Sequence, residues 1–253
     1  MTLISSVSGI RGTLGGKVGD NLTPIDVVRF ASAYGSWLLQ NHKKTIVVVG
    51  RDARPSGPMI QALVQQTLIS LGIDVIDVGL STTPTVELEV VRHKAQGGII
   101  LTASHNPKEW NALKLLNEKG EFLSADEGEQ INQMSQNLSA IDFAAVDDLG
   151  SICSETDSIQ HHIDAIRNLP LVDIKAIQTK GFKIVVDGVN SSGGIAVPQL
   201  LEALGVEVIP IHCEPNGDFP HNPEPLAHHL TDLSEAVVAH QADLGIAVDP
   251  DVD

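Results

Sequence analysis

Apolar residues in the N-terminal third of the chain alternate between helical spacing and short β-branched runs. Thr23 and Pro24 pair an N-cap residue with a proline at the first helical position, so a helix is expected to begin there. Apolar runs such as Thr45–Val49 are typical of strands buried in a parallel sheet. The elements predicted here are a helix to about Asn41, a strand over Thr45–Val49, a helix over Ser56–Ser70 and a strand over Ile73–Val78.

The same order of elements returns later in the chain. A strand over Phe182–Val186, a polar loop over Asp187–Gly194, a helix over Ala196–Leu204 and a strand over Val206–Ile211 are expected. The segments SLGIDVIDVG (70–79) and ALGVEVIPIH (203–212) can be set side by side as copies of one helix end and the strand after it. This similarity indicates an internal repeat.

Each copy ends in a further buried strand that leads into a polar loop. Gly98–Leu101 leads into Thr102-Ala-Ser104-His105, and Gly245–Val248 leads into Asp249–Asp253. Strands separated by helices imply right-handed crossovers between parallel strands. The sequence therefore predicts an α/β fold of two tandem domains of related topology, each a mostly parallel mixed sheet sandwiched by helices.

The domain boundary is expected near residues 150–157. An acidic stretch lies there, and Asp157 is in a position to N-cap a helix that runs through Asn168. We therefore assign residues 1–153 to domain I and residues 154–253 to domain II.

The overall charge limits the classes of partner that the protein can bind. The 32 acidic and 16 basic residues give a net charge of −16, which repels nucleic acid and anionic membranes and makes both poor partners. A few local cationic groups and backbone N–H groups can still hold a phosphate inside an acidic protein. Net charge therefore excludes polyanions but not a small phosphorylated ligand.

The chain lacks signals for export. Its first residues contain no charged start followed by an apolar run, and no stretch approaches the ~18 apolar residues that a membrane span needs. The two cysteines, Cys153 and Cys213, are too far apart for a CxxC metal site and favour buried structural thiols. A cytoplasmic location is expected.

Ser104 is the first candidate for chemistry, because ligands of parallel α/β sheets bind beyond the carboxyl ends of strands. It follows a predicted strand and precedes Pro107 and a stretch that we expect to be helical. A turn or N-cap serine is the ordinary alternative. A serine hydrolase is disfavoured, since His105 is a sequence neighbour whose side chain should diverge from Ser104 and no G-x-S-x-G elbow is present.

Asp249, Asp251 and Asp253 alternate in the second polar loop. Three carboxylates that converge on one point repel one another unless a cation lies between them, and all-oxygen ligation favours Mg²⁺. A solvated acidic turn is the ordinary alternative. An EF-hand is rejected, because an apolar strand precedes the loop and Pro250 interrupts it.

Phosphate binding requires positive charge and free N–H groups. The segment Ser8–Gly12 (SGIRG) offers both, although alone it is an ordinary glycine-rich loop, and Lys114 alone would be a surface lysine. Residues 188–194 lack the G-x-G-x-x-G spacing of a dinucleotide site.

Together these segments resemble the α-D-phosphohexomutase family of phosphoglucomutases, phosphomannomutases and phosphoglucosamine mutases. The matching motifs run along the whole chain in the family's order. They are SGIRG (8–12), GRDAR (50–54), TASHNP (102–107), Asn111 with Lys114, and DPDVD (249–253).

The resemblance implies that Ser104 is phosphorylated in the resting enzyme. It implies that Mg²⁺ is held by an oxygen of that phosphoserine and by Asp249, Asp251 and Asp253. Arg11 would contact the phosphoserine, and His105 and Lys114 would act in proton transfer or phosphate stabilisation.

The implied reaction moves phosphate between C1 and C6 of a hexose phosphate through a hexose 1,6-bisphosphate. The sugar is expected to be glucose or mannose phosphate, with glucosamine phosphate as the alternative.

The chain departs from the family after Asp253. Members usually carry an arginine after the aspartate loop, then a third domain that selects the sugar and a fourth that clamps its phosphate. We therefore expect a partial enzyme, inactive alone, whose partners include the missing C-terminal domains. Two readings from other classes remain open: a metal-dependent phosphatase with an aspartyl nucleophile, and a non-catalytic module that binds sugar phosphate or metal.

Overall fold

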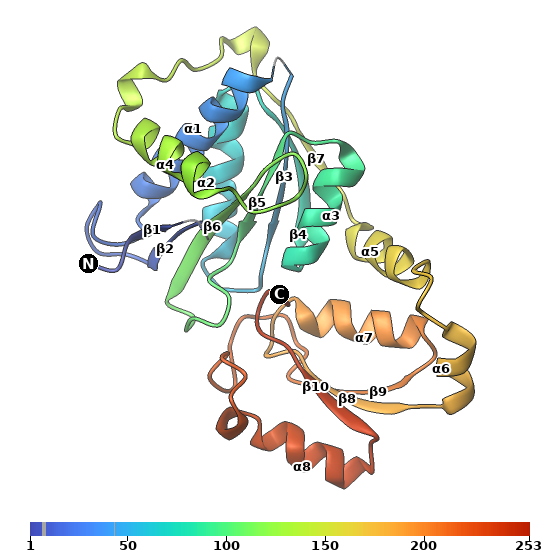
Figure 1. Cartoon of the computed structure of the whole chain (residues 1–253). Coiled ribbons are helices and arrows are strands. Elements are labelled where there is room, and N and C mark those ends of the chain that lie inside the picture. The colour runs from blue at the N-terminus through green and yellow to red at the C-terminus, as the bar shows by residue number, and fades with distance from the viewer. Residues whose placement is uncertain (7–8, 43) are drawn as a thin grey trace.

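The computed structural model describes residues 1–6, 9–42 and 44–253, and shows two α/β layered units joined along one side by helix α5 (Ser158–Arg167; Figure 1). The C-terminus lies between the two units (Figure 1). Ser8, the first residue of the SGIRG motif, is outside the described residues.

Within its described residues, the first unit is built on a mixed sheet of seven strands in the order β1-β2-β6-β5-β3-β4-β7. The strands are β1 (Ile4–Ser6), β2 (Gly9–Thr13), β3 (Ile46–Arg51), β4 (Asp74–Leu80), β5 (Gly97–Leu101), β6 (Trp110–Leu116) and β7 (Ile152–Ser154). The pairs β5-β3, β3-β4 and β4-β7 are parallel, whereas β1-β2, β2-β6 and β6-β5 are antiparallel. The central strands β3 and β5 are parallel neighbours, so their carboxyl ends lie side by side.

Helices cover both faces of this sheet. They are α1 (Pro24–Asn41), α2 (Gly57–Ser70), α3 (Thr83–His93) and α4 (Ala125–Ser135), with 3₁₀ turns η1 (Leu138–Ala140) and η2 (Val146–Asp148). Val47 and Val49 of β3 pack on the face of α1 and α2, while Val48 packs on the face of α3. Alternate residues of a buried strand thus serve two cores, which explains the unbroken apolar run.

The start of α1 follows the sequence prediction. Thr23 N-caps the helix by accepting a hydrogen bond from the Asp26 N–H, and Asp26 accepts one from the Thr23 N–H in return. This capping box satisfies two N–H groups that the helix leaves free at its first turn.

The second unit has a three-stranded parallel sheet in the order β10-β8-β9. Its elements are α6 (Ile174–Lys180), β8 (Lys183–Asp187), α7 (Gly193–Ala203), β9 (Glu207–Ile211), η3 (Ala227–His229), α8 (Thr231–His240) and β10 (Leu244–Ala247). α7 faces the first unit and α8 lies on the opposite side of the sheet (Figure 1).

The predicted repeat matches this topology. In the first unit β3, α2 and β4 follow one another and β5 returns to lie beside β3. In the second unit β8, α7 and β9 follow one another and β10 returns to lie beside β8. The helix of the second copy begins at Gly193, so the predicted loop to Gly194 is shorter than expected.

The sequence suggested a helix after Pro107, but this stretch forms strand β6. Its residues have good helix propensity, yet Leu113 and Leu115 pack on the α1 face while Leu116 packs on the α3 face. Pairing with β2 and β5 on both sides overrides the weak local preference.

The segment between the sheets also differs in detail from expectation. α5 spans Ser158–Arg167, close to the predicted helix, but Asp157 makes no side-chain capping bond, and its own N–H donates to Glu155. Cys153 is exposed in edge strand β7 and Cys213 is only half-buried, so the prediction of buried thiols is wrong for Cys153.

Across the described part of the chain, helices long and apolar enough to cross a membrane are absent.

Candidate active site

Ser104 lies in the tight turn that follows β5. Its backbone adopts a left-handed conformation (φ 50°), which is uncommon for a residue with a side chain and is kept only where the surroundings enforce it. The Ser104 N–H donates to Thr102 Oγ1 at 3.0 Å. The serine is therefore held in a defined orientation at the carboxyl end of a buried strand.

A buried ion pair holds this turn in place. Asp52 directly follows β3, and its carboxylate accepts from Arg54 Nε at 2.9 Å and from the Thr102 hydroxyl at 2.8 Å. The side chains of Asp52 and Arg54 are both fully buried. Burial raises the pKa of Asp52, and the neighbouring Arg54 and Thr102 counteract part of that rise.

The Arg54 guanidinium then binds the serine turn through its backbone. It donates to the carbonyl oxygens of Ser104 (2.5 Å), Asn106 (2.7 Å), Pro107 (2.6 Å) and Trp110 (3.1 Å). The planar guanidinium has enough donors to do this at once, which an ammonium group lacks. Arg54 is therefore a positioning residue for Ser104.

The aspartate loop follows β10 in the second unit. The hydroxyls of Ser191 and Ser192 both donate to the Pro250 carbonyl, at 2.7 and 2.8 Å. From the first unit, the Thr83 N–H and hydroxyl donate to the backbone oxygen and to a carboxylate oxygen of Asp251. Both units thus fix this loop.

The two predicted turns meet across the interface. The Ser104 hydroxyl donates to Asp249 Oδ2 at 2.6 Å, although the two residues are 145 positions apart in sequence. Lys114 on β6 reaches the same cluster, with Nζ 2.8 Å from Asp251 Oδ2 and 2.7 Å from Asp253 Oδ2. The structure therefore brings Ser104, Lys114 and the three aspartates together.

The electrostatics of this cluster follow from its burial. Burial and the negative charge of Asp251 raise the pKa of Asp249 to about 7, although the hydrogen bond from Ser104 opposes that rise. Burial lowers the pKa of Lys114, but its contacts with Asp251 and Asp253 outweigh burial and keep the pKa above its ordinary value. Lys114 is therefore a fixed cation at neutral pH.

The aspartates fit a divalent cation. One carboxylate oxygen from each of Asp249, Asp251 and Asp253 lies within 4.8 Å of the other two. Asp251 is fully buried, and its Oδ1 atom has no hydrogen-bond partner in the described structure. A buried carboxylate oxygen without a partner is costly, and oxygen ligands suit a hard cation such as Mg²⁺.

The remaining predicted residues lie near the cluster with weaker contacts. His105 is exposed, with Nδ1 3.5 Å from Ser104 Oγ, at the outer limit of a hydrogen bond. Arg11 on β2 is paired with Ala112 on β6 and so shares the sheet face of Lys114. Within the described residues Arg11 makes no hydrogen bond or ion pair to Ser104, and its buried Nε atom has no partner.

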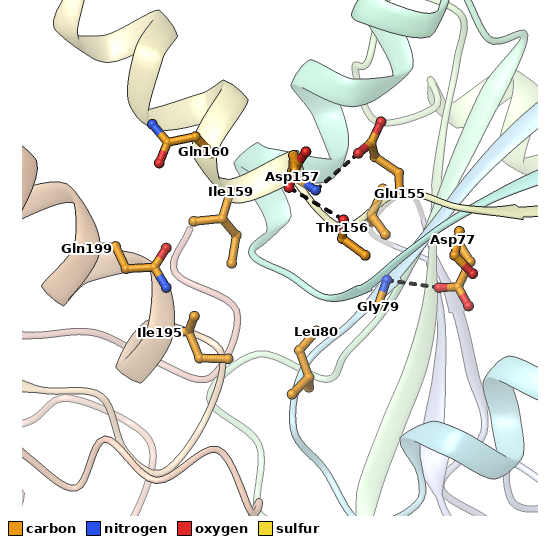
Figure 2. Close-up of a pocket in the computed structure, with 12 residues that line it drawn as sticks. Asp77, Gly79, Leu80, Glu155, Thr156, Asp157, Ile159, Gln160, Ile195 and Gln199 are labelled. Atoms are coloured by element: carbon orange, nitrogen blue, oxygen red, sulfur yellow. Dashed lines mark hydrogen bonds between the residues drawn. The ribbon is translucent and has the colours of Figure 1, made fainter.

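A hollow of 360 Å³ opens at this cluster and is lined by both turns together with Pro225. This is within the ~300–1,000 Å³ common for small-molecule sites. A separate hollow of 480 Å³ lies between β4, α5 and α7, bordered by Leu80, Ile159 and Ile195 (Figure 2). Two of its carboxylates, Asp77 and Glu155, are already paired with the Gly79 N–H and with Arg92.

Sequence reasoning missed several residues that build the site. Arg54 stands in the GRDAR segment, which was matched as a motif without a role. Thr83, Ser191 and Ser192 gave no signal, because threonine and serine at helix starts are ordinary capping residues. Glu87 was also missed; burial and then the charge of Asp253 raise its pKa, which places it in the field of the cluster.

Comparison with known proteins agrees with this arrangement. Residues 3–142 match the family description phosphoglucomutase/phosphomannomutase, alpha/beta/alpha domain I, and residues 160–253 match its alpha/beta/alpha domain II. The chain belongs to the phosphoglucomutase/phosphomannomutase family of α-D-phosphohexomutases.

Several phosphohexomutases are similar to this chain in sequence or in structure. The chain is 37% identical to a phosphoglucomutase/phosphomannomutase of Thermococcus kodakarensis, over 96% of this chain and 53% of that protein. It is 33% identical to a phosphoglucosamine mutase of Corynebacterium aurimucosum, over 100% of this chain and 55% of that protein.

The crystal structure of a phosphoglucomutase/phosphomannomutase family protein from Burkholderia thailandensis superposes with a TM-score of 0.81 at 25% identity, over 98% of this chain and 52% of that one. The chain thus spans about half the length of the relatives it matches.

Proposed function

We propose that this chain is the phosphoryl-carrying half of a phosphohexomutase that moves phosphate between C1 and C6 of a hexose phosphate. The observation that carries this proposal is the 2.6 Å contact between Ser104 Oγ and Asp249 across the two units, with Lys114 beside it. A nucleophilic hydroxyl, a cluster of cation-binding carboxylates and a fixed ammonium group are the groups that phosphoryl transfer needs.

Asp249, Asp251 and Asp253, with an oxygen of the phosphorylated Ser104, would hold Mg²⁺. When bound, the cation supplies charge neutralisation on the transferring phosphoryl group. The need for it follows from the contact distance, because a phosphate on Ser104 would lie directly against the Asp249 carboxylate and be repelled by it.

The transfer step is balanced by one proton. The bond between Ser104 Oγ and phosphorus breaks, a bond from phosphorus to a sugar hydroxyl oxygen forms, and the hydroxyl proton returns to Ser104 Oγ. His105, exposed at the mouth of the hollow, relays this proton. Lys114 stays protonated, and both Lys114 and Arg11 stabilise the phosphoryl oxygens.

The substrates are a hexose phosphate and the hexose 1,6-bisphosphate formed after the first transfer. The names of the relatives support glucose or mannose phosphate, with glucosamine phosphate as the alternative. We assign residues 1–153 to domain I and 154–253 to domain II, and expect sugar selection to come from further C-terminal domains of the polypeptide.

Intact mass spectrometry tests the phosphoserine. A phosphorylated chain should lose ~80 Da on phosphatase treatment. Ser104→Ala should abolish that increment, whereas Ser139→Ala, which changes an exposed serine away from the site, should leave it unchanged.

Labelled hexose bisphosphate tests the role against the phosphatase reading. Label on Ser104 supports a mutase, whereas label on Asp249, Asp251 or Asp253 overturns it in favour of an aspartyl phosphatase. Residues 1–253 alone should not isomerise hexose phosphate at ordinary enzyme rates, and turnover at such rates would contradict the assignment of sugar binding to further domains.

A further inference from the structure

A second cluster of metal-ligating side chains lies in the second unit, apart from the aspartate loop. Asp187 is the last residue of β8 and is only 1% exposed. Its Oδ2 atom lies 3.2 Å from His212 Nδ1 and 3.0 Å from His221 Nε2. One carboxylate oxygen therefore faces two imidazole nitrogens at once.

Both ring nitrogens of His221 face groups that can only accept hydrogen bonds. Nδ1 lies 2.8 Å from the Asn222 carbonyl oxygen, and Nε2 lies 3.0 Å from the Asp187 carboxylate. In a neutral ring, one nitrogen therefore aims a lone pair at an acceptor. This arrangement is repulsive unless a second proton or a metal ion lies between the two atoms.

His212 is in the same position. Its Nδ1 atom faces Asp187, and its Nε2 atom lies 3.4 Å from Asp232 Oδ2, so both ring nitrogens face carboxylates. A neutral ring can donate to only one of them. The other Asp187 oxygen accepts from the Val189 N–H at 3.0 Å.

Without a metal, a neutral His221 ring leaves one of its two acceptors unpaired, and the His212 ring lies beside it with the centroids 5.5 Å apart. A divalent ion satisfies all three groups with neutral rings. The His221 Nδ1–H then donates to the Asn222 carbonyl oxygen, and the outer nitrogen of His212 faces the Asp232 carboxylate at 3.4 Å; such partners are the usual support of a metal-bound imidazole.

We propose that Asp187 Oδ2, His212 Nδ1 and His221 Nε2 form a transition-metal site for which Zn²⁺ is the best-matched ion. All three ligand atoms lie within 4.8 Å of one another. Adjacent ligands of tetrahedral Zn²⁺ are about 3.3 Å apart at bond lengths of ~2.0–2.1 Å, close to the two observed separations. Imidazole ligands disfavour Mg²⁺, so the two sites of the chain select different ions.

Cys213, the next residue in sequence, is not a ligand. Its thiol faces the carbonyl oxygens of Val186 and Ile211, and burial raises its pKa. The donor set is therefore two nitrogens and one oxygen from the protein.

The site would brace a segment that packs against the serine turn. After His212 the chain runs across the first unit, where the Phe219 ring lies 5.2 Å from the Arg54 guanidinium carbon and Lys108 pairs with Asp218 at 3.1 Å. Gly217 lies so close to the Ala53 carbonyl that a side chain there would overlap it. Metal at His212 and His221 ties both ends of this segment to the end of β8.

Calorimetric titration with Zn²⁺ in excess Mg²⁺ tests the proposal, because Mg²⁺ saturates the oxygen site. One Zn²⁺ should bind, and His221→Gln and His212→Gln should each weaken binding by about tenfold or more. His228→Gln, a change to an exposed histidine paired with His229, is the matched control and should bind as the wild type. No Zn²⁺ binding by the wild type, or binding lost only in His228→Gln, would overturn the proposal.

Measurements on the unaltered chain keep the proposal testable if the variants fold poorly. Long-range ¹H–¹⁵N spectra should show His221 protonated on Nδ1 and its Nε2 resonance shifted by Zn²⁺. Co²⁺ should give a visible spectrum without a thiolate charge-transfer band. If both rings are imidazolium and neither ring responds to metal, the cluster is a set of charged hydrogen bonds and the metal site is wrong.

Discussion

The two βαβ repeats each bury a carboxylate at the end of a strand, but different basic side chains face it. Each has a buried acidic residue at the end of the strand that begins its copy of the repeat, Asp52 after β3 and Asp187 in β8. In the first unit a guanidinium on the same loop neutralises the carboxylate permanently. In the second unit two imidazoles face it. The first unit therefore pairs its carboxylate with a residue two positions away, whereas the second pairs it with side chains that follow the next strand.

The units also differ in what their last strands present. β5 leads into a hydroxyl on a strained turn, whereas β10 leads into three carboxylates. Under the proposed function neither loop is sufficient alone: the hydroxyl needs a neutralising centre, and the carboxylates need a phosphoryl group to act on. The repeat places one of each at facing edges, so the site exists only where the copies meet.

We expect the largest effect from a substitution that breaks the buried ion pair of the first unit. Arg54→Met leaves Asp52 buried without a cation and removes four bonds to the serine turn. The free energy of unfolding should fall by about 3–5 kcal/mol, measured by urea denaturation. Arg167→Met, at an exposed surface pair, is the control and should change it by less than about 0.5 kcal/mol. Equal losses in the two variants would refute the positioning role.

Lys114→Met removes the cation that the first unit lends to the aspartate loop. We expect a loss of about 2–3 kcal/mol in chelator, smaller than at Arg54 because Asp253 is one-third exposed. Mg²⁺ should restore part of it by neutralising the same carboxylates. Lys108→Met, at an exposed interdomain pair, is the matched control, and a metal-independent loss at Lys114 would argue against a cation site in this loop.

The pH dependence of stability tests Asp249. Its folded-state pKa of about 7 lies above its ordinary value, so between about pH 4 and 7 the folded chain keeps a proton that the unfolded chain loses. Stability in chelator should therefore fall as pH rises through this window, by up to about 1.4 kcal/mol per pH unit from this group.

Asp249→Asn should remove that slope, measured as the difference between wild type and variant in thermal melts at several pH values. Asp20→Asn, which changes a carboxylate in the loop before α1, serves as control. Identical slopes in wild type and Asp249→Asn would contradict the raised pKa.

The smallest effect sharpens the comparison at the start of α3. Thr83→Val removes the hydroxyl that donates to Asp251, with nearly unchanged shape, and should cost about 1 kcal/mol in urea denaturation. Thr179→Val, at an exposed position in α6, should cost less. A larger loss at Thr179 would show that the Thr83 contact adds little.

Much of this protein could be predicted from the sequence alone. The β-branched runs Ile46–Val49 and Ile184–Val186 indicate buried strands, because consecutive apolar residues in a strand point to both faces of the sheet and need an apolar layer on each. The repeat then fixes the order of strands, and parallel strands place Ser104 and Asp249 at carboxyl edges. The predicted residues Ser104, Lys114, Asp249, Asp251 and Asp253 do come together.

Only the tertiary structure decided the rest, because it depended on contacts between distant segments. β6 becomes a strand since two neighbours supply its hydrogen bonds, although its residues favour a helix locally. Arg54 acts through the backbone of a turn fifty residues away, and Asp187 meets two histidines beyond the next strand. Local patterns determine which strands and loops form. The charged side chains that contact each loop come from distant segments, which only folding brings close.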